Sequence, residues 1–538
     1  MATLPVYRLK PPHYNLRSLD DWARKLFGIQ NYSLKQINGR HSIKSDAKIV
    51  DVDVINGAVW AANMAQLWNP SLKPNLSDKN NARKIADEFV KSNDLLPSFE
   101  HEHENQFKID TLETVGSIVS ISNTKGNREN HQLDNRVRYT VKILTKDPES
   151  GSSSKVHITN GLGKFGVTIG DADEIIGYNG AWLPVEGVET DSNYIPREFA
   201  DQHFKKLTSN LKIESFDANL AYSYCCSSNK DHYLYPVWEF KATSNIKGHK
   251  VPLRIITFPA TEFGPQHIAY TPQPKRHKRP VPRTRGTRRK NLVAINPFEA
   301  GTSWIGELGG LSGSRNNAQG FVDGLASAGW NVNFNWGNCN AWETDWHDND
   351  DDYVDAADFV FYTGHAGLDG WMLVNPSNCD ADFLSSSKVG SGPQNPGDIW
   401  GGQDLEWVVV AACGPLQDDI LSPGGGDVLQ RWDGAFDGLH ILMGYGAITF
   451  DTEEEGKRLV QYSREGQTII NSWFRTAQEI QPSDNGSSAP DGPTIYVGAM
   501  WVEKSGQPSP FNDHIWGYGS VAPDPRSPNI LACMWVPC

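Results

Sequence analysis

The feature that most constrains this chain is a pair of short apolar runs that each stop at small residues, residues 357–367 and 405–414. Both are rich in β-branched and aromatic residues, which is typical of strands buried on both faces of a parallel sheet. Each run delivers one reactive side chain where it ends, His365 and then Cys413. Neighbouring parallel strands lie about 4.8 Å apart, and ligands bind at the carboxyl ends of such strands. The pattern therefore predicts a thiol and an imidazole that act together.

Either residue alone is more often structural, because free cysteine is among the most buried residue types and a lone histidine after a strand is often part of the core. The pair favours chemistry, because both residues lie among Gly and Ala, whose small side chains leave backbone N–H groups open to a substrate oxygen. The candidate N–H donors are those of Gly364, Ala366, Gly367 and Gly414.

These blocks, Gly364–Gly367 and Ala411–Gly414, resemble the His-Gly and Ala-Cys blocks of caspase-type and gingipain-type cysteine peptidases. The segment from about Gly301 to Cys538 is also similar to an uncharacterised family of microbial gingipain-like proteins. The residues that carry this second likeness are 309–314, 362–365 and 431–440.

The resemblance implies a doubly wound α/β fold with a mostly parallel sheet in the C-terminal half. It also implies that Cys413 is the nucleophile and that His365 generates the thiolate or protonates the leaving amine. One position departs from the pattern, because peptidases of this group usually have Gly directly after the histidine, where this chain has Ala366 and only then Gly367.

Charge divides the chain in two. Residues 1–290 carry 41 Lys and Arg against 31 Asp and Glu, whereas residues 291–538 carry 9 against 33. Opposite charges attract, so we expect the N-terminal half to pack on the C-terminal half as an intramolecular cover. An acidic catalytic half favours basic peptide or protein substrates and disfavours nucleic acid as a partner.

The order of the elements predicts an α+β region at 1–110, a strand-rich domain at 111–270, a linker at 271–292 and an α/β catalytic-like domain at 293–538. The strand order of the second part is similar to that of propeptide modules, although a generic antiparallel sheet would give the same pattern. Two amphipathic helices are expected over Asp78–Asn93 and over Glu453–Ala477.

The linker predicts an exposed, disordered segment, because nine of residues 271–290 are Lys or Arg with Pro and Gly between them. It is either a solvated hinge or nuclear-localisation-like patch, or a site that the enzyme cuts itself. The candidate processing residues are Arg279, Arg285 and Arg289.

Two acidic groups are further candidates. Asp418 and Asp419 follow the nucleophile closely and are either selectors of a basic side chain or solvated residues. Asp348, Asp350 and Asp352 belong to the densest acidic run, which is either a calcium site or an acidic surface loop. No other metal and no cofactor is predicted.

No apolar run approaches the ~20 residues needed to span a bilayer, and the N-terminus lacks the apolar core of a secretory signal. The chain is therefore expected to be cytoplasmic, without a membrane partner. Its seven cysteines do not form a disulfide framework at this length, so we expect Cys413 to remain a thiol in a reducing compartment.

The leading hypothesis is a cysteine endopeptidase-like hydrolase that uses the Cys413 and His365 dyad. Two alternatives remain open. The first is a non-catalytic binding or scaffold protein with the same fold, and the second is a thiol-dependent acyltransferase of small-molecule biosynthesis.

Overall fold

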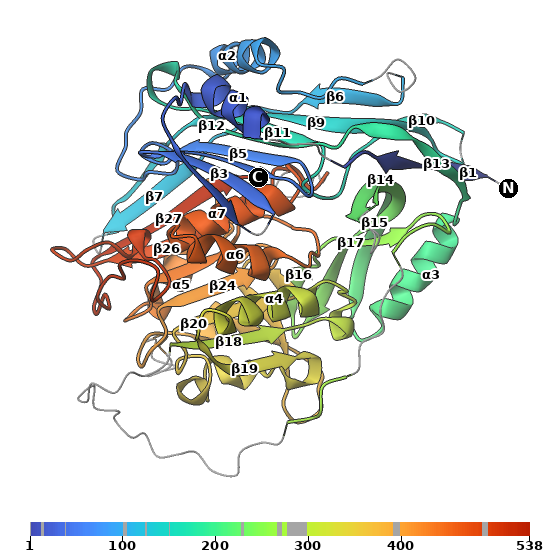
Figure 1. The fold of residues 1–538 in the computed structure, drawn as a ribbon. Coiled ribbons are helices and arrows are strands. Elements are labelled where there is room, and N and C mark those ends of the chain that lie inside the picture. Colours follow the sequence, from blue (N-terminus) through green and yellow to red (C-terminus); the bar gives the residue numbers. More distant parts are fainter. Residues whose placement is uncertain are drawn as a thin grey trace.

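The computed structural model shows a layered protein in which both halves contribute to shared layers (Figure 1). The described residues are 2–11, 16–37, 39–99, 105–123, 126–149, 151–226, 231–265, 272–276, 298–390, 399–486 and 493–538.

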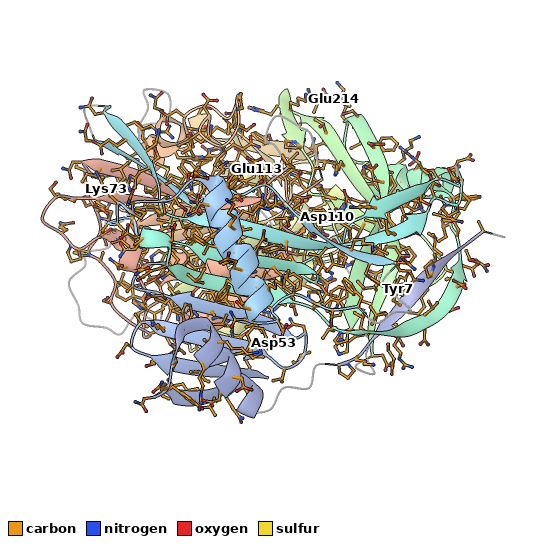
Figure 2. All side chains as sticks on the ribbon, turned by 90° about the horizontal axis from the view of Figure 1, so that it is seen from above. Tyr7, Asp53, Lys73, Asp110, Glu113 and Glu214 are labelled. Atoms are coloured by element: carbon orange, nitrogen blue, oxygen red, sulfur yellow. A yellow bond between two sulfur atoms is a disulfide. The ribbon has the colours of Figure 1, made fainter. Side chains whose placement is uncertain are left out.

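The upper layer is a nine-stranded antiparallel sheet in the order β10-β9-β11-β12-β5-β4-β3-β2, with β6 paired to β9. Helices α1 and α2 share one hydrophobic cluster with its outer face, and the view from above shows α2 lying across the strands (Figure 2). The elements are α1 (Leu16–Phe27), β2 (Ser33–Ile37), β3 (Arg40–Ser45), β4 (Lys48–Asp53), β5 (Ala58–Asn63), α2 (Lys79–Ser92), β6 (Phe107–Thr111), β9 (Asn135–Lys146), β10 (Ser153–Val156), β11 (Lys164–Ile169) and β12 (Ile175–Ala181).

A second antiparallel sheet has six strands, in the order β13-β1-β15-β14 with β16 and β17 on β15. Helix α3 packs on it through the stacked rings of Phe204 and Phe240. The elements are β1 (Thr3–Leu9), β13 (Val185–Asn193), α3 (Arg197–Leu207), β14 (Ile213–Cys226), β15 (His232–Ile246), β16 (His249–Pro252) and β17 (Ile256–Pro259).

The third sheet holds the two runs that the sequence singles out. Its order is β19-β18-β20-β24-β25-β26-β27-β7-β8, with parallel pairing from β19 to β25 and antiparallel pairing from β25 to β8. The sheet is therefore mixed, where a mostly parallel one is expected. Its strands are β7 (Ile118–Asn123), β8 (Arg128–Gln132), β18 (Glu299–Trp304), β19 (Asn331–Gly337), β20 (Phe359–Thr363), β24 (Trp407–Ala411), β25 (Ile441–Tyr445), β26 (Tyr496–Glu503) and β27 (Ile530–Pro537).

Both faces of the central strands β20, β24 and β25 are buried, as the apolar runs predict. Alternate residues of β20 enter different clusters, with Phe359 and Phe361 on one face and Val360 and Tyr362 on the other. Helices α4 (Ser314–Ala326), α6 (Glu455–Arg464) and α7 (Ile469–Ile480) belong to the first cluster. The second face is covered by the short α5 (Val428–Trp432) and by a sheet of β21 (Ala366–Gly367), β22 (Gly370–Val374) and β23 (Ala381–Ser385).

The remaining helical turns are short 3₁₀ helices. They are η1 (Asp171–Asp173), η2 (Glu307–Gly309), η3 (Asn338–Asn340), η4 (Glu343–Trp346), η5 (Asp350–Asp352), η6 (Ser386–Lys388), η7 (Asp433–Ala435) and η8 (Pro510–Asn512).

The helix expected over Asp78–Asn93 is α2, and the side chain of Asp78 caps it by accepting hydrogen bonds from two backbone N–H groups. The single helix expected over Glu453–Ala477 is wrong. The chain breaks into α6 and α7, because Gly466 adopts a left-handed φ of 83° and Thr468 caps a new helix.

The two halves are more closely joined than separate domains would be. Strand β5 pairs with β12, so residues 1–110 and 111–270 share one sheet, and β7 and β8 extend the C-terminal sheet. Buried ion pairs cross between the halves in both directions, with Arg128 on Asp418 at 2.7 Å and Arg475 on Asp51 at 2.5 Å.

Two further expectations concern cysteine and the linker. Cys339 and Cys379 form one disulfide, whereas Cys413 is a free thiol as expected. Residues 277–297, with Arg279, Arg285 and Arg289, lie outside the described residues, whereas residues 272–276 dock on the C-terminal half. Among the described residues, no helix has both the length and the apolar character needed to cross a membrane.

Candidate functional site

The register of the C-terminal sheet places His365 and Cys413 at the same edge. Thr363, the last residue of β20, lies opposite Ala411, the last residue of β24, in a parallel pair. Each candidate residue follows two positions later, so the two strands deliver them side by side at their carboxyl ends. Both side chains are fully buried.

His365 is held at both ring nitrogens. Its Nδ1 accepts a hydrogen bond from the backbone N–H of Arg254 at 3.1 Å, and its Nε2 lies 2.8 Å from the carbonyl oxygen of Gly309. A backbone N–H only donates and a carbonyl only accepts, so the ring is neutral with its proton on Nε2. Burial and the Arg254 charge lower the pKa of His365 to about 4, although the bond to Gly309 opposes them.

Cys413 lies against the loop that follows β25. The backbone N–H of Thr449 points to Sγ at 3.3 Å, and the Thr449 hydroxyl lies 3.7 Å from the same atom. Sγ also lies 3.9 Å from the Thr449 carbonyl oxygen, to which a thiol donates, and full burial keeps solutes from reaching the sulfur.

Arg254 spans the ends of the two strands. Its Nη1 donates to the Thr363 hydroxyl at 3.2 Å and to the Ala411 carbonyl at 2.6 Å, and its Nε donates to the Phe450 carbonyl at 2.9 Å. The residue is completely buried. Arg254 belongs to the N-terminal half and follows β16 by two residues. A segment of the predicted cover therefore binds the ends of β20 and β24, which carry His365 and Cys413.

Glu455 compensates the Arg254 charge. Its two carboxylate oxygens lie 3.2 and 3.0 Å from Nη2 of Arg254, and they also accept from Tyr445 at 2.6 Å, Gln481 at 2.9 Å and Asn317 at 2.8 Å. Burial alone would raise the pKa of Glu455, but Arg254 and these donors outweigh burial and hold the pKa below its ordinary value. The network is fully paired, which a buried charge requires.

The segment around Arg254 also binds the Cys413 loop. Ile255 donates to the Thr449 carbonyl at 2.8 Å, and Asp451 donates back to the Ile255 carbonyl at 2.9 Å. Gly367 faces the backbone of Lys250, so the same stretch covers the histidine loop as well. Residues 250–255 therefore contact both the loop that carries His365 and the loop that packs on Cys413.

The predicted backbone donors have different surroundings. The N–H of Gly414 donates to the Ala447 carbonyl at 3.1 Å, so it is not available to an oxyanion. Ala366 and Gly367 form β21 against β22, and a Cβ at Gly364 would collide with the Tyr362 hydroxyl.

The acidic candidates next to Cys413 are used within the fold. Asp418 is buried, accepts from the N–H groups of Ile420 and Val428 at 3.0 Å each, and pairs with Arg128. Asp419 accepts from two glycine N–H groups of the same loop. Their carboxylates organise this loop, and we do not place them in a substrate pocket.

The calcium candidates are also rearranged. Asp350 lies with Asp351 and Asp355 rather than with Asp348 and Asp352, and one carboxylate oxygen of each of the three is within 4.8 Å of the others. Burial raises the pKa of Asp355 to about 7. Its oxygens accept hydrogen bonds from the backbone N–H groups of residues 401 and 403, so the acidic run forms a cluster of carboxylates around Asp350.

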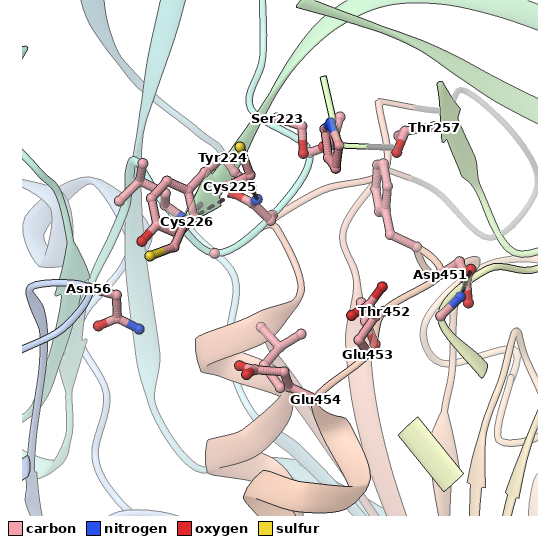
Figure 3. A pocket seen from close by; sticks show the side chains of 18 of the residues that line it. Asn56, Ser223, Tyr224, Cys225, Cys226, Thr257, Asp451, Thr452, Glu453 and Glu454 are labelled. Atoms are coloured by element: carbon pink, nitrogen blue, oxygen red, sulfur yellow. Dashed lines mark hydrogen bonds between the residues drawn. The ribbon is translucent and has the colours of Figure 1, made fainter. Parts of the chain in front are cut away.

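A cavity of about 580 Å³ lies between the halves (Figure 3). Ser223–Cys226 and Thr257 line it from one side and Asp451–Glu454 from the other. Neither His365 nor Cys413 is among the described residues that line it. The loop that bears Asp451 separates the cavity from Arg254, whose guanidinium binds Phe450.

Sequence reasoning placed His365 and Cys413 at the ends of two strands that prove to be neighbours, and it missed the residues around them. Arg254 precedes His365 by 111 residues and Glu455 follows it by 90. No sequence motif joins them. The available signal was an arginine inside the otherwise apolar run 251–256, because an arginine is almost never fully buried unless it is paired.

Residues 295–537 match the model of a family described as a domain of unknown function (DUF6345). No curated protein matches the chain. A solved structure of an uncharacterized protein from Eubacterium rectale ATCC 33656 is similar at 10% identity and a TM-score of 0.29, over 50% of this chain and 86% of that one. A likeness at this level does not establish a shared fold.

Proposed function

We propose that residues 293–538 form a cysteine endopeptidase-like hydrolase of the caspase and gingipain type, and that residues 253–255 hold it in a latent form. The observation that carries the proposal is the contact of Arg254 with the dyad. The backbone N–H of Arg254 donates to Nδ1 of His365, the nitrogen that would accept the thiol proton. The Arg254 side chain binds the ends of both β20 and β24.

The latent form follows from competition for one atom. Nε2 of His365 is occupied by Gly309, so Nδ1 is the nitrogen left to act as a base, and the Arg254 N–H occupies it. The Arg254 N–H therefore blocks the nitrogen with which His365 would take a proton from Cys413.

Release of the segment would allow hydrolysis. His365 takes the proton from Cys413, and the thiolate attacks the carbonyl carbon of a substrate amide. The C–N bond breaks as His365 returns the proton to the leaving amine, and water activated by His365 then cleaves the thioester. The remaining predicted oxyanion donors are the N–H groups of Gly364, Ala366 and Gly367.

The substrate class proposed is a basic peptide or protein. The half that carries the dyad has 33 acidic against 9 basic residues, and the residue that occupies the strand ends is itself an arginine, paired to a buried carboxylate. Self-processing at Arg279, Arg285 or Arg289 remains part of this proposal. It predicts a cut between Lys275 and Lys290 in the wild-type protein that mass spectrometry does not find in Cys413→Ala.

A thiol-labelling experiment tests the latent dyad. The double variant Arg254→Gln, Glu455→Gln keeps polar groups at both positions but removes the buried charge pair. It weakens the attachment of residues 253–255 and costs less folding stability than a single substitution, which would leave one buried charge unpaired. We expect a thiol reagent to label Cys413 in this variant and not in the wild-type protein. Cys226, which is exposed in both, reports that the reagent is active, and Cys413→Ala gives the background.

The alternative is a non-catalytic scaffold. The pKa of about 4 for His365 and the use of both its nitrogens favour this alternative, because they make the imidazole a core hydrogen-bonding group. A double variant with native circular dichroism whose Cys413 stays unlabelled, and which cleaves no arginyl peptide amide, would support the scaffold and overturn the hydrolase.

A further inference from the structure

A second arginine of the N-terminal half, Arg276, lies in a pocket with aromatic walls on the C-terminal half. Its guanidinium carbon is 3.7 Å from the ring centre of Trp342, 4.6 Å from that of Trp336 and 4.8 Å from that of Tyr353. Its side chain is 7% exposed. Three rings around one guanidinium form a cage of the kind that attracts a cation through the ring quadrupoles.

The floor of the pocket is a buried carboxylate. Asp345 accepts from Nη1 and Nη2 of Arg276 at 2.6 and 2.9 Å, and its side chain is fully buried. The Asn340 carbonyl accepts a further bond from Nη1 at 3.1 Å. A two-pronged contact of this kind matches the planar fork of arginine and not the point charge of lysine.

The pocket also forms hydrogen bonds with the main chain next to Arg276. Asn340 accepts the N–H of Arg276 at 3.1 Å and donates to the carbonyl of Pro274 at 2.8 Å. The Gln273 side chain donates to the Asn335 carbonyl at 3.2 Å and accepts the N–H of Gly337 at 2.8 Å. Lys275, between these anchors, is exposed. Gln273 and Arg276 are therefore the two anchored side chains of this segment, with Pro274 and Lys275 exposed between them. Anchored side chains together with main-chain hydrogen bonds are a common way to bind an extended peptide.

The groove belongs to the C-terminal half and is braced there. Its residues come from the end of β19 and from η3 to η5, and the disulfide between Cys339 and Cys379 ties η3 to the turn after β22. Trp342 donates its indole N–H to the Cys339 carbonyl at 2.9 Å. The recognition surface is therefore fixed by contacts that do not involve residues 273–276.

We propose that this groove is a binding site for an arginine-bearing peptide, filled in this protein by its own residues 273–276. The groove lies at the carboxyl end of β19, on the same edge of the sheet as His365. The contacts that hold residues 273–276 involve neither His365 nor Cys413. Burial raises the pKa of Asp345 to about 6, even though the Arg276 charge opposes this shift. Without Arg276, the buried carboxylate would lose its cationic partner, so the empty pocket favours a cation as its occupant.

The test empties the pocket and refills it. Arg276→Ala is titrated with the peptide acetyl-Gln-Pro-Lys-Arg-amide, and tryptophan fluorescence and calorimetry report binding. We expect one peptide to bind per chain in the variant and none in the wild-type protein, whose pocket is filled. Replacing the peptide arginine by citrulline, or adding Asp345→Asn to the variant, should weaken binding by about tenfold or more.

Lys275→Ala is the matched control, because it changes the neighbouring exposed cation, and it should behave as the wild-type protein does. A folded Arg276→Ala protein that binds no peptide, or that binds the citrulline peptide equally well, overturns the proposal. If that variant does not fold, Arg276→Lys retains the charge, and the arginyl peptide must displace the lysine; failure to do so in the folded protein also overturns it.

Discussion

Of the arginines that the N-terminal half places against the C-terminal half, Arg254 and Arg276 lie in pockets that are built differently. Arg254 is completely buried, and its donors are used by backbone carbonyls, one hydroxyl and Glu455. Arg276 has aromatic rings on its sides and Asp345 at its end. Arg254 is thus part of the buried core, whereas Arg276 lies in an aromatic pocket as a bound ligand would.

The difference lies in what each pocket would lose. Without Arg254, the ends of two central strands and a buried carboxylate lose their shared partner, so the contact is part of the core of the sheet. Without Arg276, the rings and their braces remain in place, because the disulfide and the η3 to η5 turns do not rely on it. The first contact is expected to govern stability and the second to govern recognition.

The largest effect is expected at the first pocket. Arg254→Met keeps much of the side-chain volume but leaves Glu455 buried without its cation, so the free energy of unfolding should fall by about 3–5 kcal/mol. Urea denaturation measures it. Adding Glu455→Gln should recover a large part of the loss, and a double variant no better than the single one would contradict the assigned pairing.

The next effect is a pH dependence from the histidine that Arg254 holds. The ordinary pKa of 6.5 applies in the unfolded chain, and the folded value is about 4. The unfolded state therefore takes up a proton first as pH falls, and the free energy of unfolding should drop between pH 6.5 and 4, by on the order of 3 kcal/mol in total.

His365→Gln removes this titration and should flatten that part of the curve, while stability above pH 7 carries no such contribution. Urea denaturation at several pH values compares the two proteins. Equal slopes for variant and wild type between pH 6.5 and 4 would show that the histidine is not held neutral.

A smaller loss is expected at the second pocket. Arg276→Ala removes charge-assisted hydrogen bonds and ring contacts at a site that stays otherwise intact, so the free energy of unfolding should fall by about 1–3 kcal/mol. A loss as large as that of Arg254→Met would show that both arginines are needed mainly for stability, which would contradict the difference drawn between the two pockets.

The smallest effect serves as a reference for both. Lys79 and Glu113 form a largely exposed ion pair at 3.2 Å on the upper layer. Lys79→Ala should change the free energy of unfolding by less than about 1 kcal/mol. Urea denaturation of this variant beside the two arginine variants separates the effect of losing any cation from the effect of losing a buried one.

The sequence predicts the central strands well because their signal is local. Residues 359–363 and 407–411 are apolar on both faces, and the structure buries both faces. It predicts α2 through the helical spacing of its apolar residues. It fails at Glu453–Ala477, where the hydrophobic stripe continues across a break that Gly466 and Thr468 impose.

The candidate site divides in the same way. His365 and Cys413 follow from where apolar runs stop, which is visible in any sequence window. Asp418 and Asp419 look like a substrate pocket in sequence, yet they bind loop N–H groups and Arg128. A carboxylate close to a nucleophile in sequence has no fixed direction in space until the loop that bears it is folded.

By itself, the sequence determined that a thiol and an imidazole end adjacent buried strands and that the two halves carry opposite charge. Only the tertiary structure decided that Arg254 lies on that histidine and that Arg276 lies in a ring of aromatic side chains. The physical reason is range. Hydrophobic periodicity acts between neighbours along the chain, whereas a guanidinium finds its acceptors among groups that folding brings from more than a hundred residues away.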